Sequence, residues 1–202
     1  MFQDRGRKGT TWSEQDRTYC LTVLHNETQG SKTTFTDANC NNVHVEDRLL
    51  PRLKKHIRKH CTKKDEIVLN VYINNAPCKR CAPNVISFIE ECNDEFECNV
   101  KITIKAVGPY TENDKELTEL QQSGIALKSF EGVWEEFYNL LKESEAPGDL
   151  TVDWKPTQSM IDRDKDTTNK FELLKPRLKP PKRQSTIPET FPVKKSRKSF
   201  SK

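Results

Sequence analysis

The sequence contains no long apolar run. None of its stretches approaches the roughly 18 consecutive apolar residues that a membrane span requires, and 33% of the chain is hydrophobic against 32% charged. Residues 1–16 are polar and charged, so they lack the apolar core of a secretory signal peptide. Seven cysteines are an odd number, and without a secretion signal they indicate a reducing compartment. These absences predict a protein of the cytoplasm, the nucleus or both, with no transmembrane segment and no membrane partner.

Basic charge is concentrated at the C-terminal end. Residues 175–202 hold ten Lys and Arg against one acid, Glu189, so this segment carries +9, whereas the whole chain carries +4 and residues 1–174 carry −5. Affinity for nucleic acid from charge alone would therefore come from local patches or from this tail. Its prolines and its charges also predict disorder.

Composition divides the chain into four parts. A length of 202 residues allows one domain of ordinary size with some length left over. The parts are a flexible N-terminus (1–16), a main domain (17–145), a possible C-terminal helix or linker (146–174) and a basic, Pro/Lys-rich disordered tail (175–202). Within the third part, the polar segment from Gln158 to Leu174 has the length of one final helix.

Hydrophobic patterns in the main domain predict alternating strands and helices. Strands are expected at 18–24, 33–36, 67–73, 100–106 and 125–130. Helices are expected at 44–61, from 77 onward, at 111–124 and at 133–141. A helix between the fourth and fifth strands is a crossover connection, which makes those two strands parallel. The pattern therefore predicts an α/β fold with a five-stranded mixed sheet.

The expected helix after His44 has an apolar stripe and a basic opposite face. The stripe consists of Leu49, Leu50, Leu53, Ile57 and Cys61. The basic face consists of Arg52, Lys54, Lys55, Arg58, Lys59, Lys63 and Lys64. Such a face is more often merely solvated than a track for nucleic acid. Pro51 is expected to kink this helix or to delay its regular part.

Two short stretches carry most of the chemical information. His44-Val45-Glu46 and Pro77-Cys78-Lys79-Arg80-Cys81 together read H-x-E … P-C-x-x-C, which resembles the signature of the zinc deaminases. The resemblance implies that His44, Cys78 and Cys81 bind zinc and that Glu46 transfers protons. The residue types suit these roles, because zinc binds imidazole nitrogen and thiolate sulfur, and a catalytic zinc keeps one position open for water. A proline before the cysteines fits the start of a helix, whose positive end favours thiolates.

A closed structural zinc site is the alternative. It needs a fourth protein ligand, for which the candidates are Cys40, Cys61, Cys92 and Cys98. The separation between His44 and Cys78 matches no common finger or ribbon spacing, and a structural site has no use for Glu46. We therefore favour a catalytic site.

The order of the expected elements, with the motif where it falls, resembles the AID/APOBEC-like cytidine deaminases. The resemblance covers about Thr18 to Leu141. Besides the zinc motif, it is carried by Arg17-Thr18-Tyr19-Cys20, by Asn39-Cys40-Asn41-Asn42-Val43-His44-Val45-Glu46 and by residues 121–141. It implies a three-layer α/β/α cytidine-deaminase-like fold for the main domain. In that superfamily, the crossover between strands four and five is typical of enzymes that act on polynucleotides.

The same resemblance implies a set of substrate-binding residues. Thr18 and Asn39 would lie beside the target nucleotide, with Asn39 at its sugar. Tyr110, in the loop after the fourth strand, is a candidate for stacking on a base. The backbone after Pro77 is expected to help fix the base.

Two departures indicate a divergent member of the family. Asn74-Asn75-Ala76 stands where the well-known vertebrate members carry Ser-Trp-Ser, and the loop at Val107-Gly108-Pro109 lacks the family's usual Arg. The expected function is zinc-dependent deamination of cytosine to uracil in single-stranded DNA or RNA. One alternative is a tRNA-type adenosine deaminase with the same metal chemistry. Another is a catalytically idle, zinc-containing nucleic-acid-binding protein, against which the intact Glu46 argues.

Overall fold

The computed structural model describes residues 18–39, 43–109, 114–144 and 156–175. Its strands are β1 (Tyr19–Asn26), β2 (Ser31–Ala38), β3 (Glu66–Asn75), β4 (Asn99–Gly108) and β5 (Ala126–Lys128). Its helices are α1 (Val45–His60), α2 (Cys81–Glu95), α3 (Asp114–Gln122), α4 (Trp134–Glu143) and α5 (Gln158–Leu174). Among these described residues, no helix combines the length and the apolar character needed to cross a membrane.

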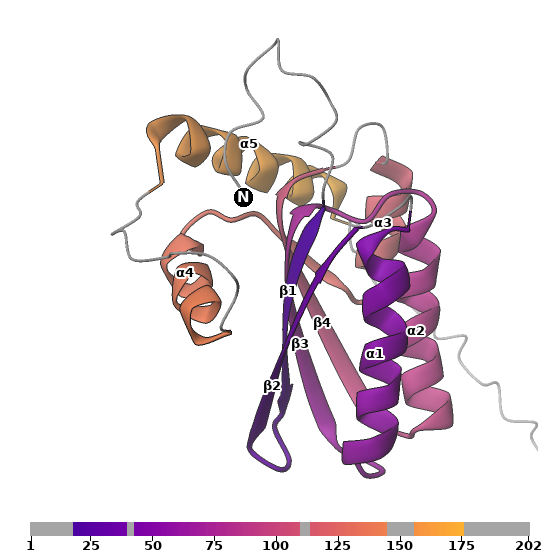
Figure 1. Cartoon of the computed structure of the whole chain (residues 1–202). Helices are drawn as coiled ribbons and strands as arrows, with labels where there is room; N and C mark the ends of the chain where they lie inside the picture. Colours follow the sequence, from indigo (N-terminus) through magenta and orange to yellow (C-terminus); the bar gives the residue numbers. More distant parts are fainter. Residues whose placement is uncertain (1–17, 40–42, 110–113, 145–155, 176–202) are drawn as a thin grey trace, which may run out of the picture.

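The strands form one mixed sheet in the order β2-β1-β3-β4-β5 (Figure 1). β1 is antiparallel to both β2 and β3, whereas β4 is parallel to β3 and β5 is parallel to β4. α3 lies in the connection from β4 to β5 and gives it the length that a parallel crossover needs. The predicted α/β class, with a five-stranded mixed sheet and strands four and five parallel, is confirmed.

Helices cover both faces of this sheet (Figure 1). On one face, Leu53 of α1 and Phe88 of α2 join Leu69 of β3 in a buried cluster. On the other face, Phe137 of α4 packs against Tyr72 of β3, with ring centroids 5.7 Å apart. Leu69 and Tyr72 reach opposite faces because side chains alternate along a strand. The three layers are consistent with the cytidine-deaminase-like fold that the resemblance implies.

The central strand β3 leads directly to the motif. Ile67, Leu69 and Ile73 are buried on one face and Tyr72 is buried on the other, as expected for a strand covered on both faces. Just beyond its end, the backbone N–H of Ala76 donates to the carbonyl oxygen of Gly108 at 2.9 Å. This bond ties the segment before Pro77 to the end of β4. The motif therefore lies at the carboxyl edge of parallel strands, where open α/β sheets place their sites.

α1 is one helix from Val45 to His60 with Pro51 inside it. Of the two effects expected of the proline, a delay of the regular part of the helix was wrong, and a kink stays a prediction. Pro51 is exposed, so its ring meets solvent, and the hydrogen bond it lacks would have gone to the carbonyl of Asp47 in the first turn. The predicted apolar stripe is buried at Leu49 and Leu53.

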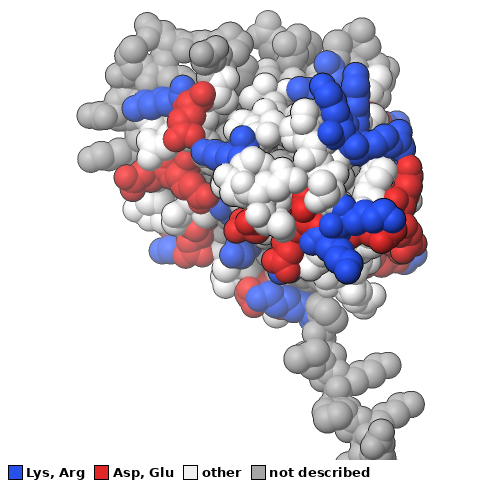
Figure 2. All heavy atoms as spheres, turned by 90° about the horizontal axis from the view of Figure 1, so that it is seen from below, with Lys and Arg blue, Asp and Glu red and all other residues white. Residues whose placement is uncertain are grey.

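Much of the basic charge on α1 is paired with acids. The ion pairs are Arg48–Asp37, Arg52–Asp37, Lys54–Glu91 and Arg58–Glu95. Figure 2 shows basic and acidic side chains interspersed over the face seen from below. The pairing leaves α1 with much less uncompensated charge than its sequence suggests.

Two arginines of α1 also reach the outer edge of β2, which pairs with β1 on its other side. Arg52 Nη1 donates to the carbonyl oxygen of Thr36 at 3.1 Å, and Arg48 Nη1 donates to that of Ala38 at 3.4 Å. Asp37 lies between Thr36 and Ala38 in the sequence, and its carboxylate forms ion pairs with both guanidinium groups. The α1 arginines thus cover part of the edge of the sheet.

Some boundaries differ from the predictions. α2 begins at Cys81 rather than at Pro77. β5 is limited to Ala126–Lys128, because Ser129 and Phe130 turn away toward α4. The predicted N-cap at Thr111 lies outside the described residues.

The predicted final helix is present as α5 and packs onto the domain. Its residues Met160 and Phe171 are buried. The indole Nε1 of Trp134 donates to Asp164 Oδ2 at 2.6 Å, and Thr167 Oγ1 donates to the carbonyl oxygen of Val107 at 3.2 Å. These bonds fix α5 to α4 and to the end of β4.

Candidate metal centre

Three side chains of the motif converge although they come from separate elements. His44 is the N-cap of α1, Cys81 is the first residue of α2, and Cys78 lies in the turn before α2. His44 Nδ1 lies 3.2 Å from Cys81 Sγ and 3.4 Å from Cys78 Sγ. All three candidate ligand atoms lie within 4.8 Å of one another. The convergence that the motif predicts is therefore present.

A tight turn sets the spacing of the two cysteines. The carbonyl oxygen of Cys78 accepts backbone hydrogen bonds from both Cys81 and Ala82, each at 2.9 Å. This turn precedes α2 and explains why the helix begins later than expected. Cys78 and Cys81 still lie one turn apart and face the same way, as their spacing requires.

The donor set fits a metal ion. Around a tetrahedral ion with bonds of about 2.0–2.3 Å, neighbouring ligand atoms lie roughly 3.5 Å apart. The two nitrogen–sulfur distances at His44 are close to this value. Both cysteines are buried and His44 is half-buried, so the group has a shielded side and an open side. His44, Cys78 and Cys81 could therefore hold a metal ion.

The electrostatics of the site favour a cation. Burial raises the pKa of the Cys81 thiol well above its ordinary value, and the nearby Glu46 and Cys78 raise it further. Three groups that can become anionic thus lie close together in a shielded place. A bound cation would reverse this effect and stabilise the thiolates.

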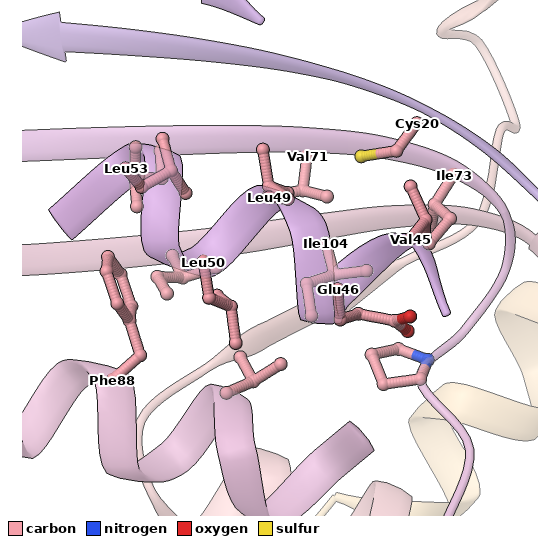
Figure 3. Close-up of a pocket in the computed structure, with 14 residues that line it drawn as sticks. Cys20, Val45, Glu46, Leu49, Leu50, Leu53, Val71, Ile73, Phe88 and Ile104 are labelled. Atoms are coloured by element: carbon pink, nitrogen blue, oxygen red, sulfur yellow. The ribbon is translucent and has the colours of Figure 1, made fainter. Parts of the chain in front are cut away.

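Glu46 lies beside this group without belonging to it. Its side chain is within hydrogen-bonding reach of the Cys81 thiol. Its residue is only 8% exposed, and burial raises the pKa of its carboxyl group, whereas hydrogen bonds and His44 lower it. Figure 3 shows the carboxylate at one end of an apolar pocket lined by Val45, Leu49 and Ile73. Glu46 is thus buried beside apolar side chains.

The described residues supply no fourth protein ligand from His, Cys, Asp or Glu to this group. Cys61 and Cys98 lie at the other end of α1, where Cys61 follows the helix and Cys98 Sγ donates to the carbonyl oxygen of Thr62. Cys92 is buried in the last turns of α2. Cys40 lies outside the described residues. For Cys61, Cys92 and Cys98, the closed-site alternative is not supported.

Thr18 and Asn39 are brought together at the same end of the sheet. The backbone N–H of Thr18 donates to Asn39 Oδ1 at 2.9 Å, and the backbone N–H of Asn39 donates to the carbonyl oxygen of Thr18 at 2.9 Å. Pro77 is buried and lines the pocket that ends at Glu46. Tyr110 lies outside the described residues.

Two pairs of residues at this end were not foreseen. Arg80 and Asp47 form an ion pair across the gap between α1 and the cysteine turn. Asn74 Oδ1 accepts a hydrogen bond from the backbone N–H of Tyr19 at 2.9 Å. Asp47 carries one usable sequence signal, since an acid three residues after an N-cap is typical of a helix start. The choice of Arg80 as its partner has no local signal.

Comparisons with known proteins give no functional assignment: no family model matches this chain, and no curated protein matches it.

Proposed function

We propose that this protein is a zinc-dependent deaminase that converts cytosine to uracil in single-stranded DNA or RNA. One observation carries the proposal: a buried carboxylate, Glu46, adjoins a group of three residues that could hold a metal ion but does not belong to that group. Three protein ligands leave a tetrahedral ion one position for water, which is typical of catalytic rather than structural zinc.

Zinc is the metal that the donor atoms favour. One imidazole and two thiolates form a borderline-soft set, which suits zinc far better than magnesium or calcium. Zinc, when bound there, would supply a nucleophilic hydroxide near neutral pH. His44, Cys78 and Cys81 would hold it, with the open side of the group toward solvent.

Glu46 would carry the protons of the reaction. It would accept one proton from the attacking water and pass it to N3 of the cytosine ring, where it stays. It would then take the second proton from the new hydroxyl group on C4 and pass it to the departing amino group. Water and cytosine then give uracil and ammonia, with no other reactant. Burial raises the pKa of the Glu46 carboxyl group above its ordinary value, which makes it a better proton acceptor than an exposed carboxylate.

The substrate class rests on the family resemblance. The parallel fourth and fifth strands, with α3 between them, match the pattern of the enzymes that act on polynucleotides. A base inside a duplex is out of reach of such a site, so a single strand is the easiest substrate.

A mutational trace in bacteria tests the proposal. The protein is expressed in cells that lack uracil repair, and the accumulated mutations are sequenced. We expect an excess of C-to-T changes over an empty vector. Glu46→Ala should abolish this excess while the protein keeps its metal, because Glu46 is not a ligand.

The other outcomes separate the alternatives. An excess of A-to-G changes would contradict the proposal and indicate an adenosine deaminase. If DNA carries no excess, transcripts from the same cells are sequenced for the same two changes. Soluble, zinc-loaded protein that edits neither nucleic acid would favour the idle binding protein. An excess that survives Glu46→Ala would overturn the role given to Glu46.

A further inference from the structure

We propose that Asp47 and Arg80 are positioning residues that hold the two halves of the metal centre together. The inference rests on the metal site of the proposed function, and not on its substrate. Arg80 Nη2 lies 2.5 Å from Asp47 Oδ2. The same carboxylate oxygen accepts the backbone N–H of His44 at 3.3 Å. Asp47 Oδ2 thus contacts both the backbone of His44 and the side chain of Arg80, which directly precedes Cys81.

The two residues lie at the starts of the two helices, each close to a candidate ligand. Asp47 is in the first turn of α1, three residues after His44. Arg80 is the N-cap of α2 and directly precedes Cys81. His44 and Cys81 are 37 residues apart in sequence, so their approach depends on how the starts of α1 and α2 are held. The Asp47–Arg80 pair bridges these two starts.

The pair is expected to act locally. The Arg80 side chain is 55% exposed and that of Asp47 is 28% exposed. Ion pairs as exposed as this contribute little to global stability. Loss of residues that orient metal ligands, in contrast, typically weakens metal binding about 10- to 100-fold. The effect should appear in metal retention and not in the unfolding of the metal-free protein.

The structure offers a matched control. Arg58 and Glu95 form an exposed ion pair between the same two helices, with Nη2 and Oε1 2.6 Å apart. This pair lies near the C-terminal ends of α1 and α2, away from the ligands. Arg58→Gln therefore removes the same kind of contact without touching the metal centre.

The test uses the full chain with Arg80→Gln, Asp47→Asn, the double variant and Arg58→Gln. The rate of zinc release to a chromogenic chelator is measured, together with the absorption spectrum of the cobalt-loaded protein. We expect about 10- to 100-fold weaker zinc retention for each single variant at the site. The double variant should be no weaker than the weaker single one, because the two residues act as a unit. Arg58→Gln should match the wild type, and Arg80→Lys should recover part of the loss.

Several results would overturn the inference. One is zinc retention in Arg80→Gln equal to that in Arg58→Gln. Another is an additive loss in the double variant, which would mean that the residues act separately. If Asp47→Asn lowers stability by weakening the start of α1, Arg80→Gln decides the matter, since it leaves that start intact. If the wild-type protein binds no zinc, both the proposed function and the positioning role of Asp47 and Arg80 are overturned. If it binds zinc but does not deaminate cytosine, only the proposed function fails, and the zinc-retention measurements still decide the positioning role.

Discussion

The side-chain oxygen of Asn74 accepts a hydrogen bond from the backbone N–H of Tyr19, 55 residues earlier in the chain. The backbone pairing of β1 with β3 ends one residue away, at Cys20 and Ile73. The Asn74 side chain therefore supplies the acceptor for the Tyr19 N–H beyond the point at which the backbone pairing ends. Asn75 Nδ2 lies 3.5 Å from Thr18 Oγ1, so both asparagines reach the start of β1. Asn74 and Asn75 stand where the deaminases that the sequence resembles carry Ser-Trp, and in this structure they have a structural role.

Asn74→Ala should lower the free energy of unfolding by about 1 to 2 kcal/mol, because the Tyr19 N–H loses its acceptor in a half-buried position. Urea unfolding measures the loss, and hydrogen exchange at the Tyr19 amide locates it. Asn74→Asp is the control, since it keeps an oxygen at that position. Equal protection of the Tyr19 amide in both variants would contradict the role given to Asn74.

Cys81→Ser should strongly reduce the zinc content of the purified protein, because a hydroxyl is a poor replacement for a thiolate ligand. The holoprotein should also melt at a lower temperature, since a bound metal stabilises the folded state. Elemental analysis and calorimetry measure the two effects. Cys61→Ser, at a half-exposed cysteine outside the site, should keep its zinc. Full zinc content and unchanged melting in Cys81→Ser would remove Cys81 from the ligand set.

Asp65 should make the protein sensitive to acid. The backbone N–H of Thr62 and the Asn26 side chain donate to its carboxylate, at 2.9 and 2.7 Å, and hold its pKa below the ordinary value of 3.8. A lowered folded pKa gives a contribution to stability that is present above 3.8 and is lost as the pH falls through the folded value. Urea unfolding between pH 7 and pH 3 should show this loss. Asp65→Asn should be less stable at pH 7 and should depend less steeply on pH, and a parallel dependence in both proteins would exclude Asp65 as its source.

Removal of residues 175–202 should separate nucleic-acid affinity from chemistry. The truncation leaves α5 complete at Leu174. We expect turnover on a short oligonucleotide to persist, while the dependence of binding on salt becomes shallower, because fewer phosphates are neutralised. Replacing the ten Lys and Arg of this segment by Gln should have the same effect at full length. A truncated protein that fails to fold would place the segment inside the domain.

The sequence predicted the parts of this structure that depend on local pattern and on the general geometry of α/β folds. The stripe with Leu49 and Leu53 predicted the buried face of α1, and the strand before Pro77 predicted where the motif would lie. The partner of Arg80 could not be predicted, because charged residues on helix starts are usually solvated. The hydrogen bond from Tyr19 to Asn74 could not be predicted from the sequence either, because a side chain replaces the backbone acceptor that strand pairing would supply. The later start of α2 follows from two hydrogen bonds to the Cys78 carbonyl, which no spacing rule contains.

The contacts from Arg48 and Arg52 to the carbonyl groups of β2 bear on self-association. An open strand edge can recruit a strand from another molecule and so begin aggregation. A second chain that paired with β2 would have to displace both guanidinium groups and leave Asp37 without its partners. Arg48 and Arg52 therefore cover carbonyl groups that an added strand would need, and they disfavour the pairing of a second chain with β2.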